Sequence, residues 1–364
     1  MNSPSDGSLT APPEKRLDTS ALPGLANLSP AYFAMVMATG IVSLAANFHG
    51  WRTIALALFW LNLAAWAALW ALNVLRMICY PRRFFGDMVD HLRGPGFFTM
   101  VASTAVLGNQ LVMFAEDYRH AVALWLVAVA LWIGLTYTIF AAFTVKETKP
   151  TLEKGITGAW LLAVVATQSL SVLSALLATH TDAPWKLGLN FFALSMWLWG
   201  GMLYIWMMSL IFYRYTFFRF SPGDLAPPYW INMGAMAIST LAGSLLIINA
   251  PQAPFLRSLL PFLKGFTVFY WATGTWWVPM LLVLGVWRHV YKRFPLKYDP
   301  LYWGAVFPLG TYAAGTHEMA RAMALDFLDF VPPVFLYVAL AAWTAAFIGL
   351  VRQLLRRVVE RRAF

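Results

Sequence analysis

Residues 155–179 read GITGAWLLAVVATQSLSVLSALLAT, a stretch without Asp, Glu, Lys or Arg. A bilayer core about 30 Å thick is crossed by roughly 20 apolar residues in a helix. Because lipid offers the backbone no hydrogen bonds, such a run must pair its own N–H and C=O groups as an α-helix. The stretch therefore predicts a membrane-spanning helix with a small, hydroxyl-bearing patch, Ala166-Thr167-Gln168-Ser169, near its middle.

Nine more runs of this kind occur in the chain. They explain a composition that is 60% hydrophobic and only 12% charged, whereas soluble domains contain about 25% charged residues. One run, 301–325, is free of charge only up to Glu318. The others are residues 30–48, 53–75, 96–115, 121–145, 187–213, 228–250, 265–287 and 330–351. The sequence predicts an all-α polytopic membrane protein with ten transmembrane helices and no soluble catalytic domain.

Lysine and arginine indicate the orientation. With the N-terminus in the cytoplasm, inner segments hold 20 of the 26 basic residues and outer segments hold 6, in agreement with the positive-inside rule. Topology therefore explains the formal charge of +10 without nucleic acid as a partner. We expect residues 28–352 to form the transmembrane domain in the plasma (inner) membrane, between a disordered cytoplasmic tail at 1–27 and a basic cytoplasmic tail at 353–364.

Alternate runs differ in composition. The odd-numbered runs are rich in Ser and Thr, whereas the even-numbered runs contain 13 of the 18 tryptophans. Small residues let helices approach closely, and hydroxyls supply hydrogen bonds that lipid lacks. The pattern predicts five helix hairpins in a pseudo-five-fold arrangement. Odd helices would form an inner ring, and even helices an outer ring whose bulky side chains face lipid or a neighbouring subunit.

The hydroxyl-rich patches of the odd runs are candidates to line a central pathway. Polar groups inside membranes tend to mark such routes. No Lys or Arg lies at mid-depth in these runs, which suits the weak binding that conduction of an anion requires. The alternative is a solid bundle in which the hydroxyls only join helices. The candidate lining residues are Thr39, Gly40, Ser43, Ser103, Thr104, Thr167, Ser239, Thr240, Gly310 and Thr311.

Proline positions suggest where inner helices could bend. Pro308 lies inside an odd run, where it removes an internal hydrogen bond, and a kink there could aim Phe307 into the pathway as a gate. Pro95 and the pair 227–228 could break helices so that their positive ends face an anion. They could equally just begin helices.

Two charged groups flank the inner runs. His91 and Arg93 precede the third run and could collect anions at the cytoplasmic mouth, although basic residues there also follow from topology alone. His317, Glu318 and Arg321 have the spacing to meet on one helical face near the outer end of the ninth run. They could couple protons to transport, or they could form a structural ion pair at a helix end.

Three motifs give the sequence a family resemblance. They are Met37-Ala38-Thr39-Gly40-Ile41-Val42-Ser43, His91-Leu92-Arg93-Gly94-Pro95-Gly96-Phe97-Phe98 and Trp303-Gly304-Ala305-Val306-Phe307-Pro308-Leu309-Gly310-Thr311-Tyr312. In their order and spacing over about residues 28–352, they resemble the tellurite-resistance/dicarboxylate transporter family. That family includes bacterial tellurite-resistance proteins, fungal malate transporters and sulfite pumps, and plant slow anion channels.

The resemblance implies an inner ring around a pore, proline kinks, and a phenylalanine gate for which Phe307 is the candidate. It implies a small anion as substrate, with C4-dicarboxylates such as malate leading, and a homotrimer in the lipid bilayer. Sulfite or tellurite-linked export and chloride or nitrate conduction are alternatives, and the choice between channel and secondary transporter stays open. The fifth and seventh runs lack the internal proline that family members often have.

Little in the sequence could build an active site. It has one cysteine and six histidines, without an HExxH pattern, a G-x-S-x-G elbow or a Walker A motif. An intramembrane enzyme that uses His317 and Glu318 as acid or base is a remote alternative. We expect a protein that is not an enzyme, has no cofactor or metal site, and does not drive ATP-coupled pumping by itself.

Overall fold

The computed structural model describes residues 23–295 and 298–362, where every regular element is helical. The odd runs form α2 (Phe33–Phe48), α5 (Phe98–Gln110), α8 (Leu162–Ala178), α10 (Ile231–Asn249) and α13 (Trp303–Met323). The even runs form α3 (Arg52–Cys79), α6 (Tyr118–Val145), α9 (Trp185–Phe217), α12 (Leu260–Val286) and α14 (Val331–Arg362). Short helices in the described connections are α1 (Pro23–Ala26), α4 (Pro81–Met88), α7 (Leu152–Gly155) and α11 (Pro254–Ser258).

Nine of the described helices are long and apolar enough to cross a membrane. The tenth predicted span is α13, a helix of 21 residues that reaches about 30 Å at 1.5 Å per residue. Its last turns contain His317, Glu318 and Arg321, which lower its mean hydropathy. Most of its side chains are buried, where protein partners can satisfy polar groups. The predicted all-α polytopic fold is confirmed.

The ten long helices form two concentric layers. The inner helices contact one another in the closed order α2, α5, α8, α10, α13 and back to α2. Each outer helix packs against the inner helix before it and the inner helix after it. For the inner helices other than α13, 72–94% of the most apolar window is buried, against 17–56% for the outer helices. The predicted inner and outer placement is therefore confirmed, whereas the pseudo-five-fold symmetry itself stays a prediction.

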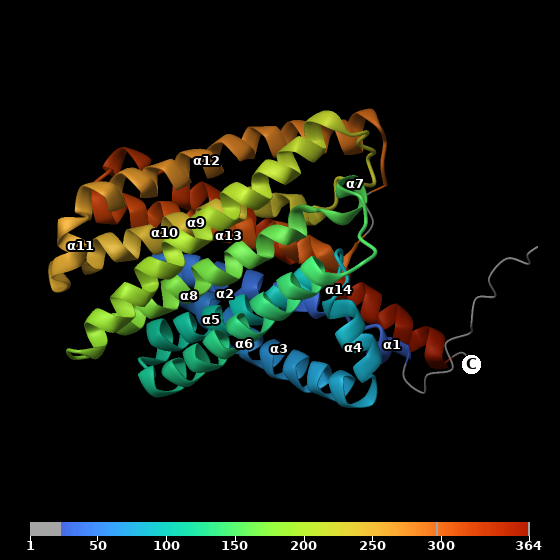
Figure 1. The fold of residues 1–364 in the computed structure, drawn as a ribbon, viewed down its shortest axis with the longest axis horizontal. Helices are drawn as coiled ribbons and strands as arrows, with labels where there is room; N and C mark the ends of the chain where they lie inside the picture. Colours follow the sequence, from blue (N-terminus) through green and yellow to red (C-terminus); the bar gives the residue numbers. More distant parts are fainter. Residues whose placement is uncertain (1–22, 296–297, 363–364) are drawn as a thin grey trace, which may run out of the picture.

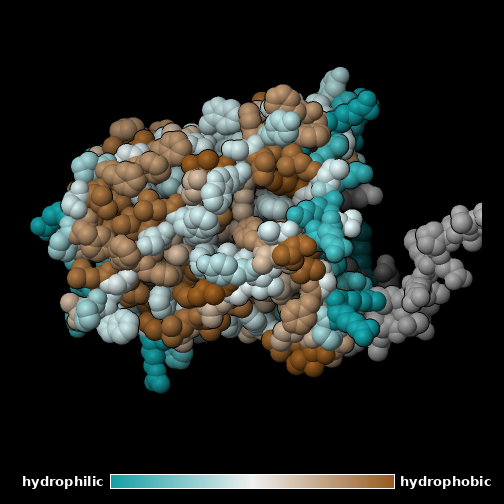
Figure 2. Space-filling model, in the orientation of Figure 1, coloured by the Kyte–Doolittle hydropathy of each residue, from teal (hydrophilic) through white to brown (hydrophobic). Residues whose placement is uncertain are grey.

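Both ends of the described chain lie at the same end of the bundle, which we call the termini side (Figure 1). Hydrophilic residues gather along this edge, and hydrophobic residues cover the body of the visible surface (Figure 2). The predicted N-terminal tail lies outside the described residues as far as residue 22, and its last residues include α1. The predicted C-terminal tail continues α14 as helix up to Arg362.

Each inner helix begins on the termini side with a tight 3-10 turn. A proline fits there because the first N–H groups of a helix have no intrahelical partner. Pro95 and the 227–228 pair therefore begin helices, the simpler of the two interpretations. The turns contact one another in the same closed order as the helices. They are Pro30–Tyr32, Gly94–Phe97, Gly158–Leu161, Pro227–Trp230 and Pro300–Tyr302.

Pro308 interrupts α13 without ending it, since helix is assigned from Trp303 to Met323. Its ring packs against Gly234 of α10, where a Cβ would lie only 2.6 Å from the Pro308 Cγ atom. The missing side chain at Gly234 is thus what lets α10 and α13 approach at Pro308.

We predict that Gly234→Ala destabilises the protein by about 1–3 kcal/mol, the usual cost of overpacking. The measurement is thermal unfolding of the detergent-solubilised protein. Gly265→Ala is the control, because no atom lies within 4 Å of a Cβ at that position. Pro308→Ala should recover part of the loss in the Gly234→Ala background. Equal stability of the two glycine variants would contradict this packing.

Candidate functional site

A cavity of about 370 Å³ lies where the five inner helices begin. All five 3-10 turns, or the helix residues directly after them, contribute to its wall, and we call it the termini-side cavity. Its described lining is Asn27, Ser29, Ala31, Tyr32, Ala34, Met37, Leu92, Arg93, Gly96, Thr99, Ala159, Leu162, Pro228, Ile231, Asp299, Pro300, Leu301, Gly304 and Phe307.

Five helix N-termini surround this cavity. Each helix N-terminus has a partial charge of roughly +0.5 from its aligned peptide dipoles and unpaired N–H groups. Anions accordingly bind at such ends in many proteins. The backbone alone therefore makes the termini-side cavity electropositive, and it does so without a cation at mid-membrane depth.

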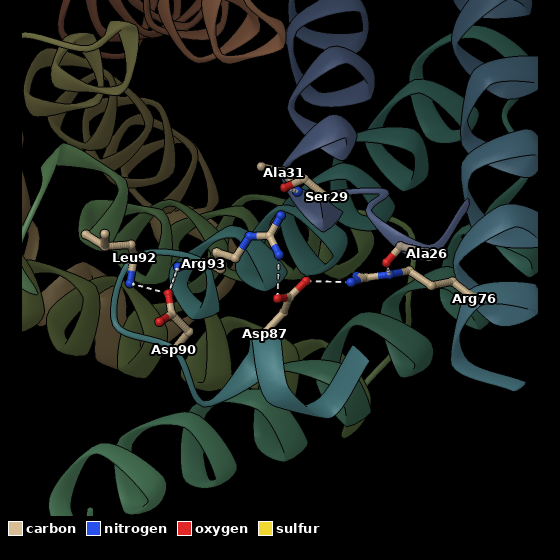
Figure 3. Close-up of polar contacts among 8 residues, drawn as sticks. All are labelled: Ala26, Ser29, Ala31, Arg76, Asp87, Asp90, Leu92 and Arg93. Carbon is tan, nitrogen blue, oxygen red and sulfur yellow. Dashed lines mark hydrogen bonds and ion pairs between the residues drawn. The ribbon is translucent and has the colours of Figure 1, made fainter. Parts of the chain in front are cut away.

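Arg93 adds a full positive charge to the wall (Figure 3). Its Nη1 atom lies 2.6 Å from Asp87 Oδ1, and the other oxygen of Asp87 lies 2.5 Å from Nη2 of Arg76. Arg76 is fully buried and donates from Nε to the carbonyl of Ala26. Asp87 thus balances only one of two guanidinium groups. Arg76, Arg93 and Asp87 together have a net charge of +1, and Arg93 is the more exposed of the two arginines.

The backbone of Arg93 is also fixed. The carboxylate of Asp90 accepts hydrogen bonds from the backbone N–H groups of Leu92 and Arg93. In Figure 3 the guanidinium of Arg93 extends away from Asp90 toward the turn that contains Ser29 and Ala31. Of the two residues predicted at this mouth, Arg93 lines the cavity in the described structure.

His91, the other residue predicted at the mouth, lies elsewhere. Its ring stacks on Phe143 with 4.1 Å between ring centroids, and its carbonyl accepts a hydrogen bond from the Trp160 indole. Burial lowers the pKa of His91, and the charge of Lys146 lowers it further. The imidazole is therefore neutral near pH 7 and packs between helices, so this conformation does not bring it to the cavity.

A second cavity of about 60 Å³ lies at the opposite end of the inner ring. We call it the far-side cavity, and all five inner segments contribute to it. Glu318 and Arg321 line it and form an ion pair with a 2.5 Å N–O distance. His317 is separate from this pair, because its ring stacks on Phe48 and lies 5.6 Å from the ring of His49. A proton-coupling role for the three residues stays a prediction.

A closed section separates the two cavities. Phe307 and Met37 are the deepest lining residues of α13 and α2 on the termini side, and both are buried. Beyond them α13 packs closely on α2, since a Cβ at Gly310 would lie 3.0 Å from the side chains of Ile41 and Val42. On α5, α8 and α10 the linings of the two cavities are ten residues apart, about 15 Å. These pairs are Thr99 and Asn109, Leu162 and Val172, and Ile231 and Leu241.

The hydroxyls predicted to line a pathway make helix contacts in this closed conformation. Ser103, Thr240 and Thr311 each donate to a backbone carbonyl three or four residues earlier in their own helix. Ser43 donates to the carbonyl of Ala55 in α3. Across the described lining, neither cavity includes a residue of the predicted pore-lining set. Their exposure to a pathway in an open conformation stays a prediction.

Indole groups of the outer helices form hydrogen bonds with the inner helices. Every outer helix donates a tryptophan Nε1–H to the inner helix that follows it around the ring, so the pattern closes on itself. Four acceptors are threonine hydroxyls and one is a backbone carbonyl. The bonds are Trp66 to Thr104 (3.2 Å), Trp132 to Thr167 (2.8 Å), Trp197 to the Ser239 carbonyl (2.9 Å), Trp271 to Thr316 (3.0 Å) and Trp343 to Thr39 (2.9 Å).

This pattern corrects the expectation that the tryptophans of the outer helices face lipid or a neighbouring subunit. That expectation fits Trp60 and Trp206, which are exposed. It is wrong for the five indoles that point inward, of which Trp197 is fully buried. The signal was present in the sequence as Trp on even runs and Thr on odd runs, but their pairing depends on how each helix is rotated about its axis.

Comparison with known proteins supplies independent information. The sequence profile of a family described as voltage-dependent anion channel (SLAC1) matches residues 27–351. A sulfite efflux pump of Trichophyton rubrum is 24% identical over 354 residues, with 89% of this chain and 90% of that protein covered. An uncharacterized transporter of Methanocaldococcus jannaschii is 23% identical over 84% of this chain and 88% of its own. An uncharacterized membrane protein of Mycobacterium tuberculosis is 37% identical over 152 residues, 42% of this chain and 77% of its own.

We predict that the Trp132–Thr167 bond stabilises the fold by about 1 kcal/mol, in the range measured for hydrogen bonds between membrane helices. The measurement is a double-mutant cycle of Trp132→Phe and Thr167→Val, read as unfolding free energy in bicelles. Trp206→Phe serves as the control for losing an indole on an exposed face. Additive effects of the two substitutions would show that the bond contributes nothing.

Proposed function

Because this chain belongs to the voltage-dependent anion channel (SLAC1) family, we propose that it moves small anions across a membrane through its inner ring. The single observation that supports this proposal most is the termini-side cavity, where five helix N-termini and Arg93 surround one space. The predicted family resemblance is confirmed by the match over residues 27–351 and by the sulfite pumps among the relatives.

An anion would enter the termini-side cavity, held by the helix N-termini and by Arg93. Asp299 on the same wall opposes that attraction, so the hold is moderate. In the far-side cavity, Arg321 is already paired with Glu318, and the pair adds little net charge. An anion attracted into the termini-side cavity could leave through the nearly neutral far-side cavity. Such an arrangement favours conduction, which requires binding weak enough to release the ion.

Phe307 is the proposed gate. It lines the inner end of the termini-side cavity and is buried at the start of the closed section. The next residue, Pro308, lacks a backbone N–H, so this turn of α13 has one fewer hydrogen bond to resist bending. A change in the kink would move the phenyl ring relative to the other four inner helices.

Two anion classes are the leading substrates. C4-dicarboxylates such as malate follow from the resemblance of the motifs. Sulfite is supported by the relatives named sulfite efflux pumps, which align with 89% of this chain. Chloride, nitrate and tellurite-linked export remain alternatives within the same chemistry.

Orientation and assembly complete the proposal. The excess of basic residues, 20 against 6, favours a plasma-membrane protein with its termini in the cytoplasm. The termini-side cavity would then open to the cytoplasm. A homotrimer is expected from the family resemblance.

We predict that Phe307→Ala raises anion flux several-fold, because removal of the ring shortens the closed section. Flux is measured in proteoliposomes with sulfite, malate, chloride and nitrate in parallel. Phe98→Ala is the matched control, since Phe98 is equally buried but does not line the termini-side cavity. Unchanged flux in Phe307→Ala would remove the gate assignment. Absence of flux for every anion in wild type and variant would reject anion transport.

We predict that Arg93→Gln lowers uptake from the termini side several-fold at low ionic strength, because the cavity wall loses a guanidinium charge. The difference should shrink as salt rises, since charges more than about 10 Å apart are screened at 0.1 M. Arg82→Gln, an exposed arginine on α4, makes the same charge change outside the cavity. If both variants lose uptake equally, surface charge and not Arg93 would be responsible.

A further inference from the structure

A groove of about 410 Å³ runs between α13 and α14 on the termini side, outside the inner ring. Its floor and walls are small or aliphatic, including Ala305 of α13 and Ala342, Ala345 and Gly349 of α14. At Gly349 the Tyr298 ring lies directly against the helix backbone, in the space that a side chain would fill. Small residues on both helices therefore leave the space between α13 and α14 unfilled, and this space is the groove.

The groove has one apolar end and one basic, aromatic end. Arg352 lies at its rim together with Tyr298 and Tyr302. Arg356 follows four residues later on the same face of α14 and is also exposed. Neither arginine has an ion pair among the described residues. Two guanidinium groups without an ion pair among the described residues thus lie where the apolar groove meets the polar edge of the molecule.

The length of the groove matches one leaflet. Arg352 and Ala342 are ten residues apart on α14, about 15 Å along the helix axis. Half of a bilayer core is also about 15 Å. A chain that begins at Arg352 and follows the groove would therefore reach the bilayer centre. Tyrosine at the basic end fits the interfacial level that aromatic residues prefer.

We propose that this groove binds an anionic phospholipid. The phosphate would pair with Arg352 and Arg356, the hydroxyl of Tyr302 would face the headgroup region, and one acyl chain would fill the groove. A soluble anion lacks the hydrocarbon that the apolar wall requires. Positive headgroup charge is disfavoured by the two arginines, and zwitterionic lipids supply no net negative charge. The site is separate from the anion pathway, so it does not depend on the proposed transport.

The test is native mass spectrometry of the detergent-solubilised full chain titrated with dioleoyl-phosphatidylglycerol or dioleoyl-phosphatidylcholine. The wild-type protein should retain phosphatidylglycerol at least five-fold more strongly than phosphatidylcholine. Arg352→Gln should make the retention of the two lipids nearly equal, whereas Arg82→Gln should leave the preference for phosphatidylglycerol unchanged. Glycerol phosphate at millimolar concentration should not displace the lipid, because the headgroup alone leaves the groove unfilled.

The second variant fills the groove. Ala345→Phe should lower binding of both lipids, whereas Thr344→Phe, on an exposed position one residue away around α14, should leave it unchanged. Gel filtration checks that each variant is folded and of wild-type size. Equal retention of the two lipids by wild type would overturn the proposal. So would a change in oligomeric state in Ala345→Phe alone, because the groove would then hold a second copy of the chain.

Discussion

An indole N–H in hydrocarbon has no water to bind, so a tryptophan turned toward a neighbouring helix is stabilised when it donates to that helix. In this protein each of the five outer helices has a tryptophan that donates to the next inner helix. Lipid provides no hydrophobic drive for helix association, so packing and such bonds decide which faces meet. The closed cycle of bonds gives every inner helix a polar contact with the outer layer, which favours one rotation of that helix about its axis.

Fixing the inner helices in this way determines what the middle of the ring can contain. Hydroxyls of Thr39, Thr104 and Thr167 are engaged by the outer layer, so the section between the cavities is closed by packed backbone and apolar side chains. Polar character collects at the two ends instead. On the termini side it comes from helix N-termini and Arg93, and on the far side from the Glu318–Arg321 pair. The positive charge at the termini-side cavity therefore comes from backbone geometry together with Arg93.

Much of this was predictable from sequence, and the misses share one cause. Ten spans follow from the length of the apolar runs, and the two layers follow from alternate enrichment in Thr and Trp. The position of Arg93 at the start of an inner helix was predictable because a basic residue before an apolar run is visible in the sequence; its role stays a prediction. The direction of Thr167 and Trp132 was not, because successive residues of a helix point about 100° apart and composition does not record rotation. The position of His91 was not predictable for a related reason, since its stacking partner Phe143 lies in a different helix.

The cycle of indole bonds also bears on how the chain is made. Four of its five links join segments that follow one another closely along the sequence. The fifth, from Trp343 to Thr39, joins residues 304 positions apart, the last outer helix to the first inner one. During synthesis the first hairpin must wait in the bilayer with one flank uncovered until the final helix is inserted. Until α14 is inserted, the cycle of indole bonds stays open at Thr39, although α13 and α2 can already contact each other.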